Sequence, residues 1–364
     1  MSNPNVLTQP AVSASGEVVS LLIEKFNNRV HEQYLKGENL LQWFDVQEVV
    51  GTNSVSNKYI GETELQVLSP GKSPDASPTE FDKNRLVVDT TVIARNTVAH
   101  FHDVQNDIDG LKSKLSVNQA KKLKKMEDSM VIQQLILGGI SNTEAIRENP
   151  RVAGHGFSIH IVGLASSFLT SPQYMMAAIE MAMEQQTEQE VDTSELCGLM
   201  PWTAFNCLRD ADRIVDKSYT IAASDNTVDG FVLKSWNTPI VPSNRFPKLS
   251  DNTEGTGDTK HHKLSNAGNG NRYDVTAGQT TAQAVLFTQD ALLVGRTISI
   301  TGDIFYEKKE KTWYIDTFLA EGAIPDRWEA VAVVTAAATE ELATDHAAIL
   351  ARANRKVVQT KSVN

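Results

Sequence analysis

The feature that most constrains this chain is a long β-hairpin predicted over residues 53–100. A strand-like alternation runs from 59 to 67, and a second strand is expected from Arg85 to about Ala99. The connection at 69–78 holds three prolines and leads into a charged stretch at 80–83. A two-stranded ribbon is only marginally stable in water by itself. The sequence therefore predicts that this hairpin lies on a surface that no adjacent strand supplies.

Residues 1–52 are predicted to form an N-terminal arm with one amphipathic helix at 17–36. Leu22 and Phe26 belong to a single apolar stripe whose members are three or four residues apart. One helix cannot bury such a stripe alone. We therefore expect the arm to dock on the rest of its own chain or on a neighbouring molecule.

The longest helix is predicted at 107–139, with Asp107 and Asp109 at its start and two glycines, Gly138 and Gly139, at its end. Lysines crowd its first half. One interpretation is a solvated face, which charge runs usually form; the other is a face that meets nucleic acid or an acidic neighbouring molecule. The lysines assigned to such a contact are Lys112, Lys121, Lys122, Lys124 and Lys125.

The middle of the chain is predicted to be an α/β unit. It contains a strand at 157–162, a helix after Ser171-Pro172, a buried strand at 196–200, a helix at 203–216 capped by Thr203, and short strands near 219–222, 230–236 and 240–241. The polar tract 248–284 is predicted to be a long surface loop. A strand within 285–306, a charged turn at 307–311, strands at 313–316 and 329–334, and a peripheral helix within 336–358 are expected to follow.

Composition excludes several classes of protein. The apolar content of 41% and charged content of 22% are typical of a globular protein. A net charge of −11 argues against tight binding of nucleic acid by the whole molecule, because such binding comes from Lys and Arg that neutralise phosphates. Cys197 and Cys207 are too few for a disulfide framework and are expected to be reduced and buried. No apolar run is long enough to span a membrane, and the first 16 residues do not resemble a signal peptide.

Motifs for catalysis or metal binding are weak. His100 and His102 could project from one face of a strand, but a zinc site needs three or four ligands, and a structural role is favoured. His261 and His262 lie in the polar tract and are expected to be solvated. The sequence has neither a phosphate-binding Gly-Lys-Ser/Thr loop nor a Gly-x-Ser-x-Gly elbow. We therefore assign no catalytic residue, no metal ligand and no cofactor.

The order of elements resembles that of the major capsid proteins of tailed double-stranded-DNA phages, which have the Hong Kong 97 fold, and particularly those of short-tailed phages. The order is an arm, a long hairpin, a long helix, an inserted α/β unit and returning strands. The resemblance spans roughly residues 20–335. The local stretches that carry it are 86–94, 102–107, 199–205, 230–232, 237–242, 284–291, 318–322 and 327–331.

The resemblance implies an α+β fold with a particular division of the chain. The expected parts are the N-terminal arm (1–52), an extended loop (53–100), a peripheral domain with a spine helix (101–160), an axial domain with the polar tract 248–284 as an insertion (161–302), peripheral return strands (303–335) and a C-terminal tail (336–364).

The resemblance also implies a structural protein, not an enzyme, whose pentamers and hexamers form an icosahedral head around DNA. Its implied partners are other copies of itself, a scaffolding protein, a portal, a decoration protein and, weakly, packaged DNA, with no membrane. It would be assembled in the host cytoplasm and reside in the virion. The expected contacts between copies are Lys72, Asp75, Glu80, Asp82 and Lys83 in the hairpin tip, Leu22 and Phe26 in the arm, and Trp313.

Two alternatives stay open. The chain could be a cytosolic α/β enzyme or ligand-binding protein in which 248–284 forms a lid, or the shell of an encapsulin-like compartment. The size of the assembled particle separates the first alternative from a shell, and copurifying cargo protein in place of DNA would favour the second.

Overall fold

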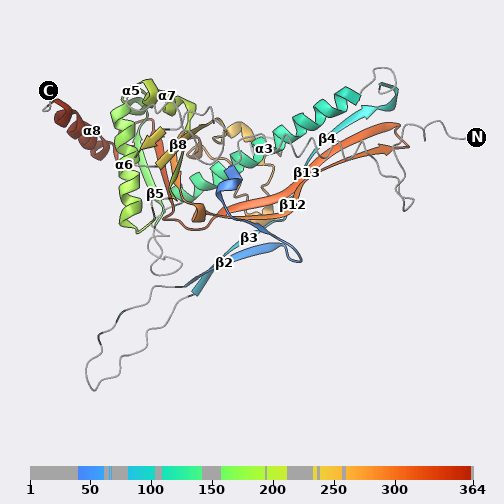
Figure 1. The fold of residues 1–364 in the computed structure, drawn as a ribbon, viewed down its shortest axis with the longest axis horizontal. Coiled ribbons are helices and arrows are strands. Elements are labelled where there is room, and N and C mark those ends of the chain that lie inside the picture. Colours follow the sequence, from blue (N-terminus) through green and yellow to red (C-terminus); the bar gives the residue numbers. More distant parts are fainter. Residues whose placement is uncertain are drawn as a thin grey trace, which may run out of the picture.

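Two sheets of different shape organise the chain, which is an α+β protein (Figure 1). The computed structural model describes residues 40–60, 65, 67, 81–102, 109–141, 157–192, 195–210, 233–235, 238–255 and 260–361. A six-stranded sheet forms one lobe, and a long, narrow sheet extends away from it.

The six-stranded sheet has the order β5-β14-β11-β6-β8-β7. Its strands are β5 (Ile159–Leu164), β14 (Val331–Ala337), β11 (Ala282–Phe287), β6 (Cys197–Pro201), β8 (Thr238–Ser243) and β7 (Leu233–Ser235). The helices α5 (Ala165–Thr170), α6 (Pro172–Glu188), α7 (Trp202–Asp210) and α8 (His346–Lys361) belong to the same lobe. Both faces of β14 are covered, since Ala332 and Val334 lie in one core while Val331 and Val333 lie in another. This explains why β14 is almost continuously apolar.

The narrow sheet has the order β1-β12-β13-β4. Its strands are β1 (Val46–Glu48), β12 (Leu292–Glu307), β13 (Thr312–Pro325) and β4 (Val92–Ala99). The antiparallel pair β12–β13 forms a ribbon whose 16-residue strand β12 extends about 50 Å. The charged turn at 308–311 that the sequence indicated closes this ribbon at its outer end.

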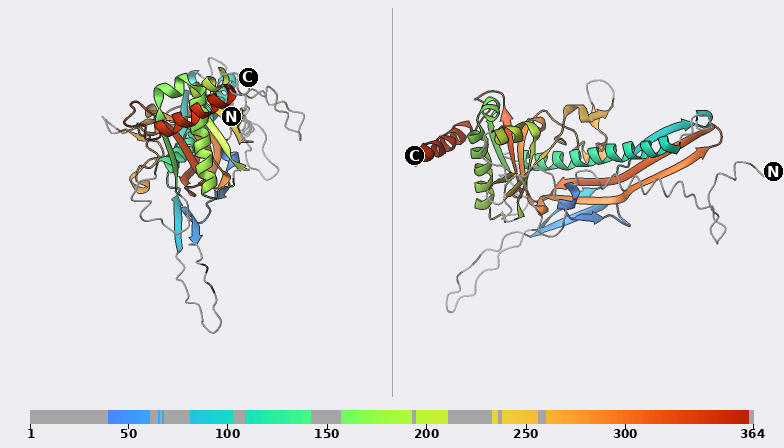
Figure 2. Two further views of the ribbon diagram at one scale, coloured as in Figure 1. Left: turned by 90° about the vertical axis from the view of Figure 1, so that its left-hand side faces the viewer. Right: turned by 45° about the horizontal axis from the view of Figure 1, so that its top comes forward.

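Helix α3 (Asp109–Ile140) joins the two sheets (Figure 2). Its inner half, from Met130 to Ile136, packs under the six-stranded sheet. Its outer half packs on the ribbon, where Ala120 lies in one cluster with Val98 and Ile315. The helix was predicted at 107–139, but the two glycines do not stop it. They lie in its last turn, where a Cβ added at Gly139 would come within 2.2 Å of Val333 Cγ2, so they permit close packing on β14.

A separate hairpin of β2 (Ser54–Ile60) and β3 (Phe81–Val87) lies on the side of the ribbon opposite α3 (Figures 1 and 2). The sequence predicted one strand from Arg85 to about Ala99, and this was wrong. The chain breaks at 88–91, because Val88 is buried against β12 and β13, and β4 then pairs with β13 instead of with β2.

Other predictions are corrected by tertiary packing. Helix α7 begins at Trp202, so Thr203 lies inside its first turn and does not cap it. Strand β14 belongs to the six-stranded sheet and is not a return strand of the ribbon. The last residues of the expected arm dock on the chain itself. There Leu40 and Leu41 of η2 (Leu40–Trp43) are buried together with Phe44, and β1 pairs with β12.

The polar tract 248–284 is not a loose surface loop in its described part. It contains η4 (Leu249–Asp251), β9 (Asn252–Glu254), β10 (His261–His262), η5 (Ala267–Asn269), η6 (Gln279–Thr281) and the start of β11, with η7 (Gln289–Ala291) following that strand. Leu264 and Tyr273 are buried in the core beside α3. The buried amide of Gln133 in α3 donates to the carbonyls of Arg272 and Asp274 at 3.2 and 3.4 Å. His262 is buried as well, which contradicts the solvated position expected for it.

Candidate assembly interfaces

The base of the β2–β3 hairpin is fixed to the body by one carboxylate, Asp326. Asn57 Nδ2 donates to Asp326 Oδ2 at 2.6 Å, Asn84 Nδ2 donates to Asp326 Oδ1 at 3.0 Å, and the Tyr59 hydroxyl donates to the same group. Leu86 packs with apolar residues of β12 and β13 below it. At its base, the hairpin therefore lies on β12 and β13 of its own chain, which are far from it in sequence, and not only on a neighbouring molecule.

Beyond this base the described hairpin residues are exposed. Phe81 is 73% exposed, Leu65 94% and Val67 91%. Lys83 is also exposed and lies directly opposite Lys58, a like-charge pair that disfavours the isolated hairpin. Exposed apolar side chains on a projecting hairpin are typical of a surface that another molecule covers.

Of the other contacts expected in the hairpin and the arm, one lies in the described residues. Asp82 lies in β3 opposite Tyr59. Lys72, Asp75 and Glu80 fall outside the described residues, as do Leu22 and Phe26.

Aromatic side chains gather at the outer end of the ribbon. The rings of Trp313 and Tyr306 are 5.0 Å apart, and those of Phe305 and Tyr314 are stacked at 5.2 Å. The guanidinium of Arg95 lies 5.5 Å from the Tyr314 ring centre. Aromatic and arginine side chains are enriched in protein interfaces, so this end of the ribbon has the composition of a contact surface. Trp313, expected as a contact, is half-buried within this group.

A cluster of buried charges surrounds the middle of α3. Lys124 Nζ lies 3.1 Å from Glu127 Oε1 and 3.3 Å from Asp128 Oδ1, and Arg245 Nε lies 3.8 Å from Asp128 Oδ2. Lys124 was expected among the lysines that could face DNA. This is wrong, because its side chain is 3% exposed and its ammonium group is held by two carboxylates.

The same cluster extends to the ribbon through Arg296 of β12. Its Nη2 lies 2.9 Å from Glu321 Oε2 of β13 and 3.8 Å from Glu127 Oε1. Burial raises the pKa of Glu321 to about 8, with Glu127 adding to the effect, and burial raises the pKa of Asp128 to about 7. Three cations and three carboxylates thus join α3, β12, β13 and the segment after β8.

These raised pKa values predict that the folded protein loses stability as the pH rises from 6.5 to 9. At pH 6.5 the folded protein retains protons on Glu321 and Asp128 that the unfolded chain, with ordinary carboxyl pKa values, has released. While the folded protein keeps these protons, each pH unit costs up to about 1.4 kcal/mol per group, and the decline levels off above the pKa of Glu321, about 8. Urea unfolding at constant ionic strength measures this. Glu321→Gln and Asp128→Asn should each flatten the decline, and a flat wild-type profile would contradict the prediction.

The remaining lysines of α3 differ from Lys124. Lys121, Lys122 and Lys125 are exposed, and the side chain of Lys112 lies outside the described residues. Sequence reasoning grouped all of them because they are adjacent in the chain. Lys124 differs because its position on the helix faces the ribbon, whereas Lys121, Lys122 and Lys125 face solvent.

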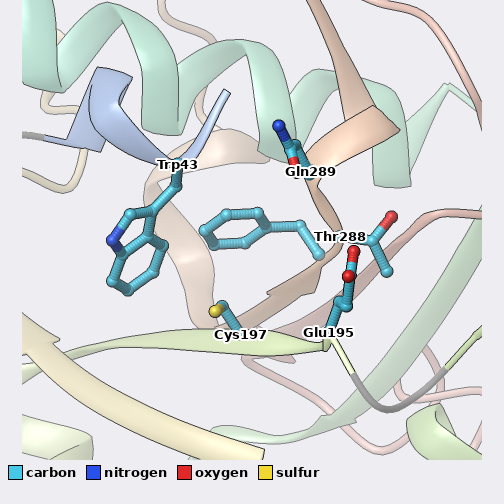
Figure 3. A pocket seen from close by; sticks show the side chains of 6 residues that line it. Trp43, Glu195, Cys197, Thr288 and Gln289 are labelled. Carbon is cyan, nitrogen blue, oxygen red and sulfur yellow. The ribbon is translucent and has the colours of Figure 1, made fainter. Parts of the chain in front are cut away.

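A small pocket lies between η2 and the ends of β6 and β11 (Figure 3). Trp43, Cys197 and Phe287 line it with Glu195, Thr288 and Gln289, and its volume is about 190 Å³. Ligand pockets usually measure about 300–1,000 Å³. Burial raises the pKa of the Cys197 thiol, whereas a nucleophilic cysteine needs a lowered one. Neither cysteine forms a disulfide, and both are half-buried.

The histidines that the sequence singled out lie in two places, His100 and His102 after β4 and His261 and His262 in β10. Within the described part of the chain no group of three or more His, Cys, Asp or Glu side chains is placed to hold a metal ion. His261 instead pairs with Asp274 at 2.6 Å, and this contact holds the polar tract together. Among the described helices, none is both long and apolar enough to cross a membrane.

The sequence did not reveal Asp326, Arg296 or Glu321 as anchoring residues. Each of them lies far along the chain from the groups that it binds, so no local spacing could have indicated the pairing. The one available signal was a charged residue at a position where the strand is otherwise mostly apolar, as at Glu321 in β13.

Comparison with solved structures places this arrangement among capsids. The chain is similar to the capsid protein of cyanophage P-SCSP1u, with a TM-score of 0.64 and 15% identity over 82% of this chain and 87% of that one. The protein of the bacteriophage PhiM1 mature capsid gives a TM-score of 0.61 and 15% identity over 81% and 86%. The protein of a virus-like particle from Pyrococcus furiosus gives a TM-score of 0.50 and 13% identity over 86% of this chain and 98% of that one.

No protein-family model and no curated protein matches the chain in sequence. At such identities the likeness concerns the fold, and the fold is of the Hong Kong 97 type. The fold class expected from the order of the elements is thereby confirmed.

Proposed function

We propose that this chain is the major capsid protein of a tailed bacteriophage, a structural subunit that assembles into the icosahedral head. The observation that carries the proposal is the fold, shared over more than four fifths of the chain with two phage capsid proteins. The exposed hairpin and the aromatic end of the ribbon support it, since they are two separate surfaces that suit contacts with other copies.

These surfaces suit a head-to-tail arrangement. The hairpin and the ribbon end belong to different parts of the molecule, so a contact between the hairpin of one copy and the body of the next is heterologous. A heterologous contact forms a ring when the rotation between successive copies closes. Pentamers and hexamers are the rings that an icosahedral shell requires. Several interfaces of about 1,600 Å² for each subunit would hold it cooperatively.

The finer parts of the proposal follow from the same role. We keep the domain division expected from the sequence, with two changes. Residues 40–49 dock on the body, and β14 belongs to the axial sheet. The subunit would be a non-enzymatic protein, assembled in the host cytoplasm with a scaffolding protein, a portal and a decoration protein, and present in the virion around packaged DNA.

Electron microscopy of the expressed protein tests the proposal. We expect the purified chain, alone or coexpressed with a scaffolding protein, to form closed shells or rings of five and six copies. Gel filtration should place most of the protein in the void volume. A discrete small oligomer at every concentration, with no ring or shell in micrographs, would contradict the proposal and favour an α/β enzyme.

The likeness to the Pyrococcus furiosus particle supports a second candidate, a compartment shell. Nuclease treatment followed by analysis of the particle contents separates the two. Protected double-stranded DNA is expected from the phage head, and a folded cargo protein from the compartment.

A further inference from the structure

The outer half of α3 presents a single face to solvent, and that face is almost entirely lysine. Between residues 114 and 140 only five side chains of α3 are exposed. They are Lys114, Asn118, Lys121, Lys122 and Lys125. The four lysines, called the lysine face below, extend over about 16 Å of helix.

The ribbon explains why these positions share a face. Gln119 donates to the carbonyl of Ile315 at 2.9 Å and accepts from the hydroxyl of Thr317 at 2.7 Å. Ala120 packs beside it in the small core between helix and ribbon. The lysine face is therefore the side of α3 that points away from the sheet.

None of the four ammonium groups lies within ion-pair distance of a carboxylate among the described residues. Lys124, which is adjacent to Lys125 in the chain, has two carboxylates within ion-pair distance. The chain as a whole carries a net charge of −11, so an isolated concentration of positive charge is not a consequence of its composition. Four cations of the same sign on one helix face repel one another and favour a polyanion.

We infer that the lysine face binds the phosphate backbone of double-stranded DNA, and that it forms part of the inner wall of the shell. This inference rests on the proposed function and names the surface that meets the genome. Each DNA strand presents a phosphate about every 3.4 Å along the helix axis, so a backbone passing over α3 offers each flexible lysine a partner. The face has no arginine or aromatic side chain, which suits contact with the backbone and not with base edges.

An acidic protein is the other polyanion, and the composition of the face disfavours it. Protein interfaces are depleted in lysine and enriched in aromatic side chains, yet the exposed positions of described α3 hold no apolar residue. The exposed apolar side chains Phe81, Leu65 and Val67 belong to the hairpin, on the opposite side of the ribbon (Figure 2). The two sides of the subunit thus differ in chemistry, one suited to other copies and one to phosphate.

The test compares two variants that each lose four positive charges. Lys114, Lys121, Lys122 and Lys125 are changed to Gln in the first. The matched control changes Lys248, Lys260, Lys263 and Arg355, which are exposed away from α3, the hairpin and the ribbon end, to Gln. Binding of unassembled full-length subunits to a duplex of about 20 base pairs is measured by fluorescence anisotropy over a range of NaCl concentrations.

The affinity of the wild-type subunit should fall with salt, with a logarithmic slope of up to about −3.6 if each lysine neutralises one phosphate. The first variant should lose about three units of that slope, and the control variant should keep it. An unchanged slope in the first variant would overturn the inference. So would displacement of wild-type protein from DNA by a much lower concentration of polyglutamate than of competitor duplex, which would indicate an acidic protein.

Electron microscopy of the same variants separates this inference from the proposed function. Both variants should assemble as the wild type does. If only the first variant fails to form shells, the lysine face is a contact between copies and the inference is wrong. If the wild type forms no shell, the proposed function fails, whatever the salt slope shows.

Discussion

Replacing residues 61–80 with a two-residue Asn-Gly turn should abolish shell formation and leave the subunit folded. Ile60 and Phe81 form the outermost pair of the β2–β3 ladder, and Asn-Gly is the preferred connection between two directly paired residues. The groups that fix the base, Asn57 and Asn84 on Asp326, are untouched. Loss of one contact worth about 3 kcal/mol raises the protein concentration needed for assembly by roughly 100-fold. Light scattering and electron micrographs measure this.

A milder variant serves as the control for that deletion. Leu65→Ser with Val67→Ser keeps the length of the hairpin and removes only apolar surface, so it should weaken assembly by a smaller factor. Thermal unfolding of both variants should match that of the wild type within a few degrees. Normal shells from the shortened chain, at the wild-type protein concentration, would refute a role of the hairpin in assembly.

Arg296→Met should destabilise the subunit by about 2 kcal/mol at pH 9.5, where the Glu321 carboxyl, whose pKa is about 8, is ionised in the folded protein; this is the largest effect of a single substitution that we expect. Arg296 lies 2.9 Å from Glu321 Oε2, and the Glu321 side chain is 1% exposed. Removing one partner of a buried ion pair leaves the other charge uncompensated in a medium that solvates it poorly. At pH 6 the loss should be smaller, because the raised pKa of Glu321 lets that carboxyl take up a proton. Chemical denaturation at the two pH values measures the difference.

The double variant Arg296→Met with Glu321→Met supplies the control for the buried pair. Arg296 and Glu321 are directly opposite in the β12–β13 ladder, so two apolar side chains there can pack together. Replacing both members of such a pair is often neutral, and the double variant should recover most of the lost stability. A double variant as unstable as the single one would show that Arg296 acts through packing and not through charge.

Local signals in the sequence predicted the elements whose ends are set by nearby residues. Ser171 and Pro172 start α6, with the Ser171 side chain accepting from Tyr174 N, and the charged turn closes the β12–β13 ribbon. The polar tract was misjudged because hydrogen bonds hold it as much as apolar burial does. The side chains of Asn252 and Gln133 bond its backbone, and neither contact has a signature in hydropathy.

The candidate contact surfaces were only partly predictable for the same reason. The lysines of α3 are adjacent in sequence, yet one turn of helix places Lys124 in a buried cluster and its neighbours in solvent. Which of them faces outward depends on where the ribbon lies, and that is fixed by residues almost 200 positions away, such as Ile315. The order of the elements did predict the fold, because that order reflects the topology of the chain. The residue at a single position carries no such information.

Since α3 belongs to two cores at once, its length is restricted in evolution. Inserting one residue between Ala120 and Met130 would turn the outer half by about 100° relative to the inner half, and the lysines would then point into the ribbon. Changes of seven residues, close to two complete turns, keep both faces in register. Homologous chains can therefore lengthen this helix only in steps of about seven residues, each with a matching extension of β12 and β13.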